Sequence, residues 1–316
     1  MEIKQYKATF FAILAAALYG ISSPISKLLL KEIPPMLMAS FLYLGAGSGI
    51  SIIQFIKHTK YREKTEARLT KHELPYIIGM VLLDIVAPIF LMYGLTITTA
   101  ANASLLNNFE IVATSLIALL IFKESISKRL WGAISLITVS SIILSVEDLS
   151  SFSFSFGSIF VLIACICWGL ENNCTRKLSL KDPLEIVVIK GFGSGIGSLL
   201  IALTLGEQTY NVPYIIAALL LGFFAYGLGI SFYIYAQRDL GAAKTSAYYA
   251  IAPFIGVGLS LIIFREIPTF SFVIALVIML IGTYFASTEK HNHIHTHEEY
   301  THTHKHTQDI HHIHAH

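Results

Sequence analysis

The sequence predicts an all-α integral membrane protein with about ten transmembrane helices in two inverted five-helix repeats. The first observation is composition, since 54% of the residues are hydrophobic and only 13% are charged. The mean hydropathy of +0.66 is far above that of a soluble domain of average composition. The second observation is internal duplication, because the apolar segments of residues 1–150 recur in residues 151–290.

Each predicted helix is an apolar stretch of about 17–25 residues, long enough to cross a hydrocarbon core. A bilayer offers no water to unpaired backbone groups, so continuous spans of this length favour helices over a barrel. Lys4 and Lys7 precede the first stretch as in a secretory signal, but we expect it to be retained because it is the repeat partner of the sixth. In order, the helices are expected near 9–30, 35–56, 75–96, 100–122, 130–146, 157–178, 185–205, 213–236, 244–264 and 268–287.

The duplication is visible in individual residues. The matched pairs are Tyr19-Gly20 with Trp168-Gly169, the glycine ladder 45–50 with 191–196, Tyr93 with Tyr235, and Phe122-Lys123-Glu124 with Phe264-Arg265-Glu266. The glycines stand at spacings that let helix backbones approach closely. Five helices is an odd number, so the second block must enter the membrane upside down. Inverted repeats of this kind build the alternating-access machinery of many secondary transporters.

The basic residues predict the orientation. With the N-terminus inside, three Lys- and Arg-rich loops fall in the cytoplasm, and the opposite loops are nearly free of such residues, with Lys31 and Arg265 as the main exceptions. We therefore expect a multi-pass plasma membrane protein with both termini cytoplasmic. The basic loop residues are Lys57, Lys60, Arg62, Lys64, Arg68 and Lys71, then Lys123, Lys128 and Arg129, then Lys177 and Lys181.

A charge inside a span is costly, so each one is a functional hypothesis that needs a partner. The candidates are Asp84, Glu110, Glu171 and Lys190. Asn107, Glu110 and Thr114 share one helical face, which should look into a polar cavity. The alternative is that Glu110 only forms a salt bridge that fixes helix packing. Lys190 either snorkels to the nearer membrane surface or pairs with a carboxylate.

The sixth span is dense in polar groups and carries two stripes. Trp168, Asn172 and Arg176 form one, and Cys167, Glu171 and Cys174 form the other. The second stripe combines soft and hard metal ligands, although the cysteines can equally be small packing residues. A further polar spot is expected at Asp84, because Pro88 leaves its carbonyl without a helical donor. Pro24 and Pro253 create the same situation in spans one and nine, as hinges or as static kinks.

The C-terminal segment 291–316 is predicted to be a disordered, His-rich cytoplasmic tail that binds zinc, nickel or cobalt. Its irregular spacing argues against a cloning tag. No metal or other cofactor is expected to be required for transport itself. The predicted metal ligands are His291, His293, His295, His297, His302, His304, His306, His311, His312, His314 and His316.

The duplicated blocks, each with an acidic residue after its fourth helix, resemble the drug/metabolite transporter superfamily, EamA type. The resemblance extends to about residue 287 and implies ten helices and export of small metabolites such as amino acids. That family usually carries a proline in the middle of helices four and nine. Pro253 fits this pattern, whereas span four has Glu110 where proline is common.

We therefore expect a secondary exporter rather than an enzyme. No phosphate loop is present, and His58 and His72, the only histidines outside the tail, lie in a basic loop. The alternative is divalent metal efflux with the tail as metal collector. Expected partners are the lipid bilayer and a small-molecule substrate, not nucleic acid, with a homodimer left open. The predicted cavity residues are Tyr19, Asp84, Tyr93, Asn107, Glu110, Trp168, Glu171, Asn172 and Tyr249.

Overall fold

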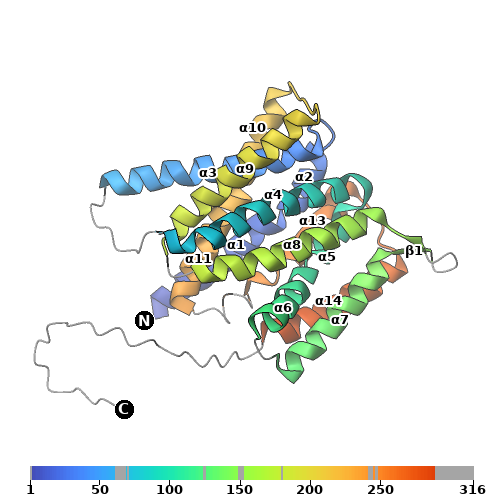
Figure 1. The fold of residues 1–316 in the computed structure, drawn as a ribbon. Coiled ribbons are helices and arrows are strands. Elements are labelled where there is room, and N and C mark those ends of the chain that lie inside the picture. The colour runs from blue at the N-terminus through green and yellow to red at the C-terminus, as the bar shows by residue number, and fades with distance from the viewer. Residues whose placement is uncertain are drawn as a thin grey trace, which may run out of the picture.

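The computed structural model describes residues 2–60, 69, 71–123, 126–148, 153–178, 181–240, 245 and 248–288. Figure 1 shows these residues as a bundle of helices. The first repeat comprises α1 (Glu2–Gly20), α2 (Ser22–Leu29), α3 (Pro35–Lys60), the 3-10 turn η1 (Lys71–Glu73), α4 (Leu74–Ile97), α5 (Ala100–Leu106), α6 (Phe109–Phe122) and α7 (Lys128–Ser145).

A short antiparallel hairpin of β1 (Val146–Asp148) and β2 (Ser153–Phe154) joins the two repeats. The second repeat comprises α8 (Phe156–Leu178), α9 (Pro183–Thr204), α10 (Val212–Leu221), the π-helix η2 (Gly222–Leu228), α11 (Gly229–Leu240), α13 (Ala252–Phe264) and α14 (Phe270–Ser287). Within the described residues, nine helices are long and apolar enough to cross a membrane, and α13 is a shorter apolar helix. The predicted all-α membrane fold of about ten helices is confirmed.

The helices pair across the repeats rather than within them. The third span of the first repeat, α4, packs against the first span of the second repeat, α8. With the repeats exchanged, the third span of the second repeat includes α11, which packs against α1. The corresponding helices α3 and α9 also contact each other, as do α7 and α14 at one side of the bundle (Figure 1). The centre of the molecule is therefore built from both repeats.

The glycine ladders lie where α3 and α9 cross. A Cβ atom added to Gly47 would come within 2.9 Å of the backbone nitrogen of Phe192. Such a distance is closer than packed carbon atoms tolerate, so only glycine permits this approach. The small residues that recur in both repeats thus bring the two backbones together.

Three spans have a local irregularity near their middle, which we call a break. Span one breaks at Ile21, between α1 and α2, and span four breaks at Asn107 and Asn108, between α5 and α6. Span nine makes a turn at residues 250–251, immediately before α13. Pro24 and Pro253 lie close after two of these breaks, whereas α4 remains helical through Pro88. At each of these places the junction residues keep right-handed helical dihedral angles and backbone hydrogen bonds cross the junction, so the breaks are local irregularities within otherwise continuous spans.

The repeats also match in their helix caps. Lys123 and Arg265 end α6 and α13 with left-handed backbones, at φ values of 55° and 52°. This conformation is uncommon for residues other than glycine. Ser127 and Thr269 then cap α7 and α14 by accepting hydrogen bonds from backbone N–H groups three residues on. The duplicated sequence therefore repeats its turn geometry as well as its hydrophobic pattern.

The eighth span contains an insertion relative to the third. Residues 75–78 and 213–216 share the sequence Pro-Tyr-Ile-Ile, yet Tyr93 and Tyr235 lie four positions further apart than those two segments. The π-helix η2 lies between them. A π-helix accommodates extra residues without ending the span, and such irregular turns are frequent at functional sites.

Candidate functional site

Lys190 lies at the centre of an ion-pair cluster with Asp84 and Glu171. Its Nζ atom is 3.1 Å from Asp84 Oδ2 and 3.1 Å from Glu171 Oε1. Asp84 is fully buried, and the Glu171 side chain is only 2% exposed. Of the two alternatives for Lys190, pairing with a carboxylate is the one found. Because an isolated charge in this environment would be very unfavourable, each group depends on the others.

Two hydroxyl groups complete this cluster. Tyr43 Oη donates a hydrogen bond to Asp84 Oδ1 at 3.0 Å, and the Thr175 hydroxyl donates to Glu171 Oε1. The four carrying helices are α3 and α4 from the first repeat and α8 and α9 from the second. The cluster therefore ties the two repeats together through polar groups.

Glu110 lies apart from this cluster and has neutral hydrogen-bonding partners. Asn172 Nδ2 donates to Glu110 Oε1 at 2.6 Å and is also 3.3 Å from Thr114 Oγ1. Among the side chains that the structure describes, no Lys, Arg or His lies within ion-pair distance of Glu110. The described residues thus give Glu110 no salt-bridge partner of the kind considered from the sequence.

The unusual position of Glu110 has a structural explanation. Glu110 is the second residue of α6, and Pro253 is the second residue of α13, each just after the break in its span. Proline is tolerated in the first turn of a helix because its missing N–H group would have no helical partner there. A carboxylate is favoured at the same place because it interacts with the positive end of the helix dipole. Both residues therefore suit the beginning of a half-helix.

A cluster of tyrosines lies beside these charges. We call it the tyrosine cluster; its members are Tyr19, Tyr43, Tyr226, Tyr233 and Tyr249. The ring centroids are 5.9 Å apart for Tyr19 and Tyr226, 5.8 Å for Tyr19 and Tyr249, and 4.9 Å for Tyr233 and Tyr249. Tyr43 and Tyr226 are 5.4 Å apart, so Tyr43 joins this cluster to Asp84.

The structure brings most of the predicted cavity residues together. Asp84 and Glu171 share Lys190, Glu110 contacts Asn172, and Tyr19 contacts Tyr249. Trp168 is buried on α8, one turn before Asn172. Asn107 is buried in the break before Glu110, where it accepts a weak contact from Cys165 Sγ at 4.0 Å.

Tyr93 is the exception. Its hydroxyl donates to Glu207 Oε1 at 3.4 Å, and the other oxygen of Glu207 accepts the backbone N–H of Leu37. These groups lie where α9 ends and α3 begins, away from the ion-pair cluster.

Sequence reasoning missed Tyr43, Tyr226 and Tyr233. Only Tyr226 left a usable signal, since it lies as far before Tyr235 as Asp84 lies before Tyr93.

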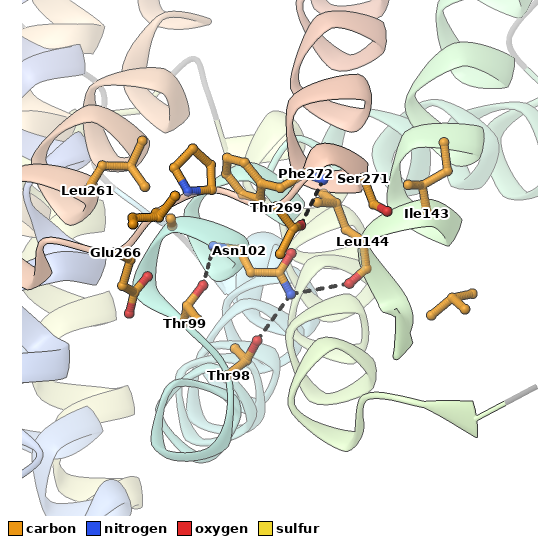
Figure 2. A pocket seen from close by; sticks show the side chains of 14 residues that line it. Thr98, Thr99, Asn102, Ile143, Leu144, Leu261, Glu266, Thr269, Ser271 and Phe272 are labelled. Atoms are coloured by element: carbon orange, nitrogen blue, oxygen red, sulfur yellow. Dashed lines mark hydrogen bonds between the residues drawn. The ribbon is translucent and has the colours of Figure 1, made fainter. Parts of the chain in front are cut away.

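A cavity of about 460 Å³ lies between the ends of α4, α7 and α13 and the beginning of α14 (Figure 2). Thr98, Asn102, Glu266, Thr269 and Phe272 are among its lining residues. Asn102 Nδ2 donates hydrogen bonds to Thr98 Oγ1 and to the carbonyl oxygen of Leu144. These bonds hold the Asn102 side chain in position in the wall of the cavity. None of the predicted cavity residues lines this space.

The proposed metal stripe of α8 does not form a ligand set. Within the described part of the chain, no three His, Cys, Asp or Glu side chains are placed to hold a metal ion. Glu171 is engaged by Lys190 and Thr175, while Cys174 packs against Gly79 of α4. The histidines of 291–316 lie outside the described residues.

Comparison with known proteins identifies the family. The EamA-like transporter family matches residues 6–146 and 155–288. An uncharacterized transporter of Methanothermobacter thermautotrophicus is 29% identical over 292 residues, covering 86% of this chain and 83% of the relative. The uncharacterized transporter YyaM of Bacillus subtilis is 24% identical, covering 70% and 75%, and an uncharacterized transporter of Clostridium kluyveri is 23% identical, covering 91% and 96%.

The fold agrees with these matches. A solved crystal structure of 15% sequence identity superimposes with a TM-score of 0.64, covering 88% of this chain and 95% of the other. At that identity the likeness concerns the fold alone. Together with the duplicated helices and the buried charges between them, the family match shows that this multi-pass membrane protein is a transporter that belongs to the EamA-like transporter family.

Proposed function

We propose that the protein exports a small metabolite, an amino acid or a related compound, across the plasma membrane by alternating access. The observation that carries the proposal is the ion-pair cluster of Asp84, Glu171 and Lys190, because its members come from both repeats. A merely structural bundle gains little from buried charges, since apolar side chains of similar size stabilise a core at least as well.

The balance of charge suggests how transport is driven. Within the described spans, the central polar region holds three carboxylates, Asp84, Glu110 and Glu171, and one ammonium group, Lys190. An uncompensated negative charge in the membrane interior is unfavourable, so the empty carrier needs a bound cation before it changes conformation. Glu110, which has neutral partners, is the carboxylate proposed to exchange a proton with the solvent.

The orientation belongs to the same proposal. By the positive-inside rule, the Lys- and Arg-rich ends of α3, α7 and α8 support a cytoplasmic location for both termini. A reporter enzyme that is active only outside the cytoplasm, fused after residue 288, should then be inactive. An active fusion would reverse the direction assigned to the transporter.

The test of export is a metabolite profile. Cells expressing the intact protein are compared with empty-vector cells and with cells expressing Glu110→Gln or Glu185→Gln. We expect cells expressing the intact protein or Glu185→Gln to contain less of one metabolite class than empty-vector cells. Cells expressing Glu110→Gln should contain as much of it as the empty-vector cells. Glu185 is a matched control because it is a carboxylate in the first turn of α9, outside both clusters. Equal depletion by all three proteins would reject Glu110 as the coupling residue, and no depletion would reject export.

Divalent metal efflux is the second candidate, and the His-rich tail is the observation that favours it. It predicts that cells expressing the intact protein contain less nickel, cobalt or zinc, and that a chain ending at residue 288 loses this effect. Unchanged metal content in both strains would reject metal efflux and leave metabolite export as the remaining proposal.

A further inference from the structure

The Glu110 carboxylate is available to a ligand in a way that Asp84 and Glu171 are not. Asp84 and Glu171 share Lys190, whereas Glu110 Oε1 accepts a hydrogen bond from a neutral amide. Glu110 is only partly buried, although it lies in the middle of span four. An ionised, partly exposed carboxylate inside the membrane attracts a cation.

Aromatic rings lie beside this carboxylate. Spans one, four and nine cross next to Glu110, because a Cβ atom added to Gly256 would come within 2.7 Å of Ser104 Oγ and 2.9 Å of the Gly20 carbonyl oxygen. Tyr19 and Tyr249 precede this crossing on spans one and nine, and Glu110 follows it on span four, which runs in the opposite direction, so all three lie on the same side of the crossing. The rings of Tyr19 and Tyr249 are 5.8 Å apart, and Tyr226 of η2 lies 5.9 Å from Tyr19 on its other side. Tyr19 and Tyr249 are themselves partly exposed. A carboxylate combined with aromatic faces is the chemistry by which proteins recognise organic ammonium groups.

The only described ammonium group of this region is already engaged. Lys190 lies 3.1 Å from each of two carboxylates, so it has no charge to offer to an anionic ligand. A substrate carboxylate would also be repelled by Glu110 and Glu171. The charges therefore select for a cation and against an anion.

From these contacts we propose that the transported molecule is recognised by a protonated amino group, seated between the Glu110 carboxylate and the rings of Tyr19 and Tyr249. This inference rests on the proposed transport function and narrows its substrate class. Amines that lack a carboxylate bind best, zwitterionic amino acids bind less well, and N-acylated anions do not bind.

The test is ligand-induced thermal stabilisation of the full-length protein in detergent. The probes are phenethylamine, phenylalanine methyl ester, phenylalanine and N-acetylphenylalanine, with butylamine and N-butylacetamide as a smaller matched pair. We expect the amines to raise the unfolding temperature in a concentration-dependent way, phenylalanine to do so more weakly, and the N-acetyl compounds to have no effect.

Two variants assign the effect to the site. Glu110→Gln keeps the acceptor for Asn172 and should weaken amine binding by about tenfold or more, since a charged hydrogen bond is lost. Tyr249→Leu should weaken it about two- to fivefold through the lost cation–π contact. Glu110→Asp, which retains the charge, should recover part of the binding, and Glu185→Gln should bind as the intact protein does.

The outcomes separate this inference from the transport proposal. Stabilisation by the N-acetyl compounds, unchanged amine binding in Glu110→Gln, or no stabilisation by any amine would overturn amine recognition. In each of those cases the metabolite profile could still show Glu110-dependent export of a neutral or anionic compound. A profile without depletion, in contrast, would reject export even if the amines bind.

Discussion

Two regions of the molecule occupy equivalent places in the two repeats but hold different chemistry. One is the ion-pair cluster of α4, α8 and α9. The matched pairs identify the equivalent residues in the other repeat. Tyr226 corresponds to Asp84 when counted from Tyr235 and Tyr93, and Ser22 corresponds to Glu171 when counted from Tyr19 and Trp168. Leu44 corresponds to Lys190 when counted from the two glycine ladders. In this second region Ser22 Oγ and Tyr226 Oη are 3.3 Å apart, a neutral hydrogen bond.

The two repeats have the same backbone arrangement, but the contacts at equivalent positions differ in strength. Breaking a neutral hydrogen bond costs about 0.5–1.5 kcal/mol, whereas leaving one partner of a buried ion pair alone costs about 3–5 kcal/mol. A movement that separates α9 from α4 and α8 breaks both ion pairs of Lys190. The equivalent movement of α3 away from η2 and α2 leaves the Ser22–Tyr226 hydrogen bond intact, because that bond joins α2 to η2 and Leu44 takes no part in it. Unequal contacts of this kind make the two orientations of a symmetric transporter unequal in stability.

The largest expected effect tests the charged region. Lys190→Leu leaves Asp84 and Glu171 buried without their cation, and should lower the free energy of unfolding by about 3–5 kcal/mol. Thermal unfolding in detergent measures this loss. Lys190→Arg, which keeps the charge, should recover part of it, and the exposed Lys31→Ala is the control. A Lys190→Leu protein as stable as its parent would mean that the ion pairs do not hold the helices together.

The next effect separates stability from transport. Glu110→Gln should preserve the folded protein, because Asn172 can donate to an amide oxygen as it does to the carboxylate. Substrate movement in reconstituted vesicles should nevertheless fall by about tenfold or more, since the charged group is gone. If transport and stability fell together, Glu110 would be a packing residue.

A smaller effect is expected in the neutral region. Tyr226→Phe removes the hydroxyl that meets Ser22 but keeps the ring beside Tyr19 and Tyr43. The free energy of unfolding should fall by about 0.5–1.5 kcal/mol. Chemical or thermal denaturation alongside Lys190→Leu gives the comparison directly. Equal losses for the two variants would remove the energetic difference between the regions.

The smallest effect concerns the tail, which belongs to neither region. A chain ending at residue 288 should unfold at the same temperature as the full-length protein in the absence of metal. Zinc or nickel binding, measured by titration calorimetry, should disappear with the tail. In the full-length protein this binding should weaken below about pH 6.5, where imidazole becomes protonated and no longer coordinates metal. Binding that persists without the tail would point to a site among the helices.

Much of the site was accessible from sequence because charged residues are rare in the spans. Asp84, Glu110 and Glu171 were identifiable by their cost in lipid, and the face shared by Glu110 and Thr114 followed from helical spacing. Tyr43 was not identifiable, because a tyrosine is an ordinary core residue until its hydroxyl is found on Asp84. Tyr93 carries the same side chain as Tyr43, yet its hydroxyl reaches Glu207 at the bundle end.

The sequence by itself determined the class of protein, the number and order of its spans and the inverted duplication. These follow from local properties, namely apolar length and repeated residues, which do not depend on how the helices pack. Only the tertiary structure decided that Lys190 joins two carboxylates, that Glu110 has a neutral partner, and that spans four and nine break before Glu110 and Pro253. Those outcomes depend on which helix faces meet across the two repeats, and no local pattern specifies that arrangement.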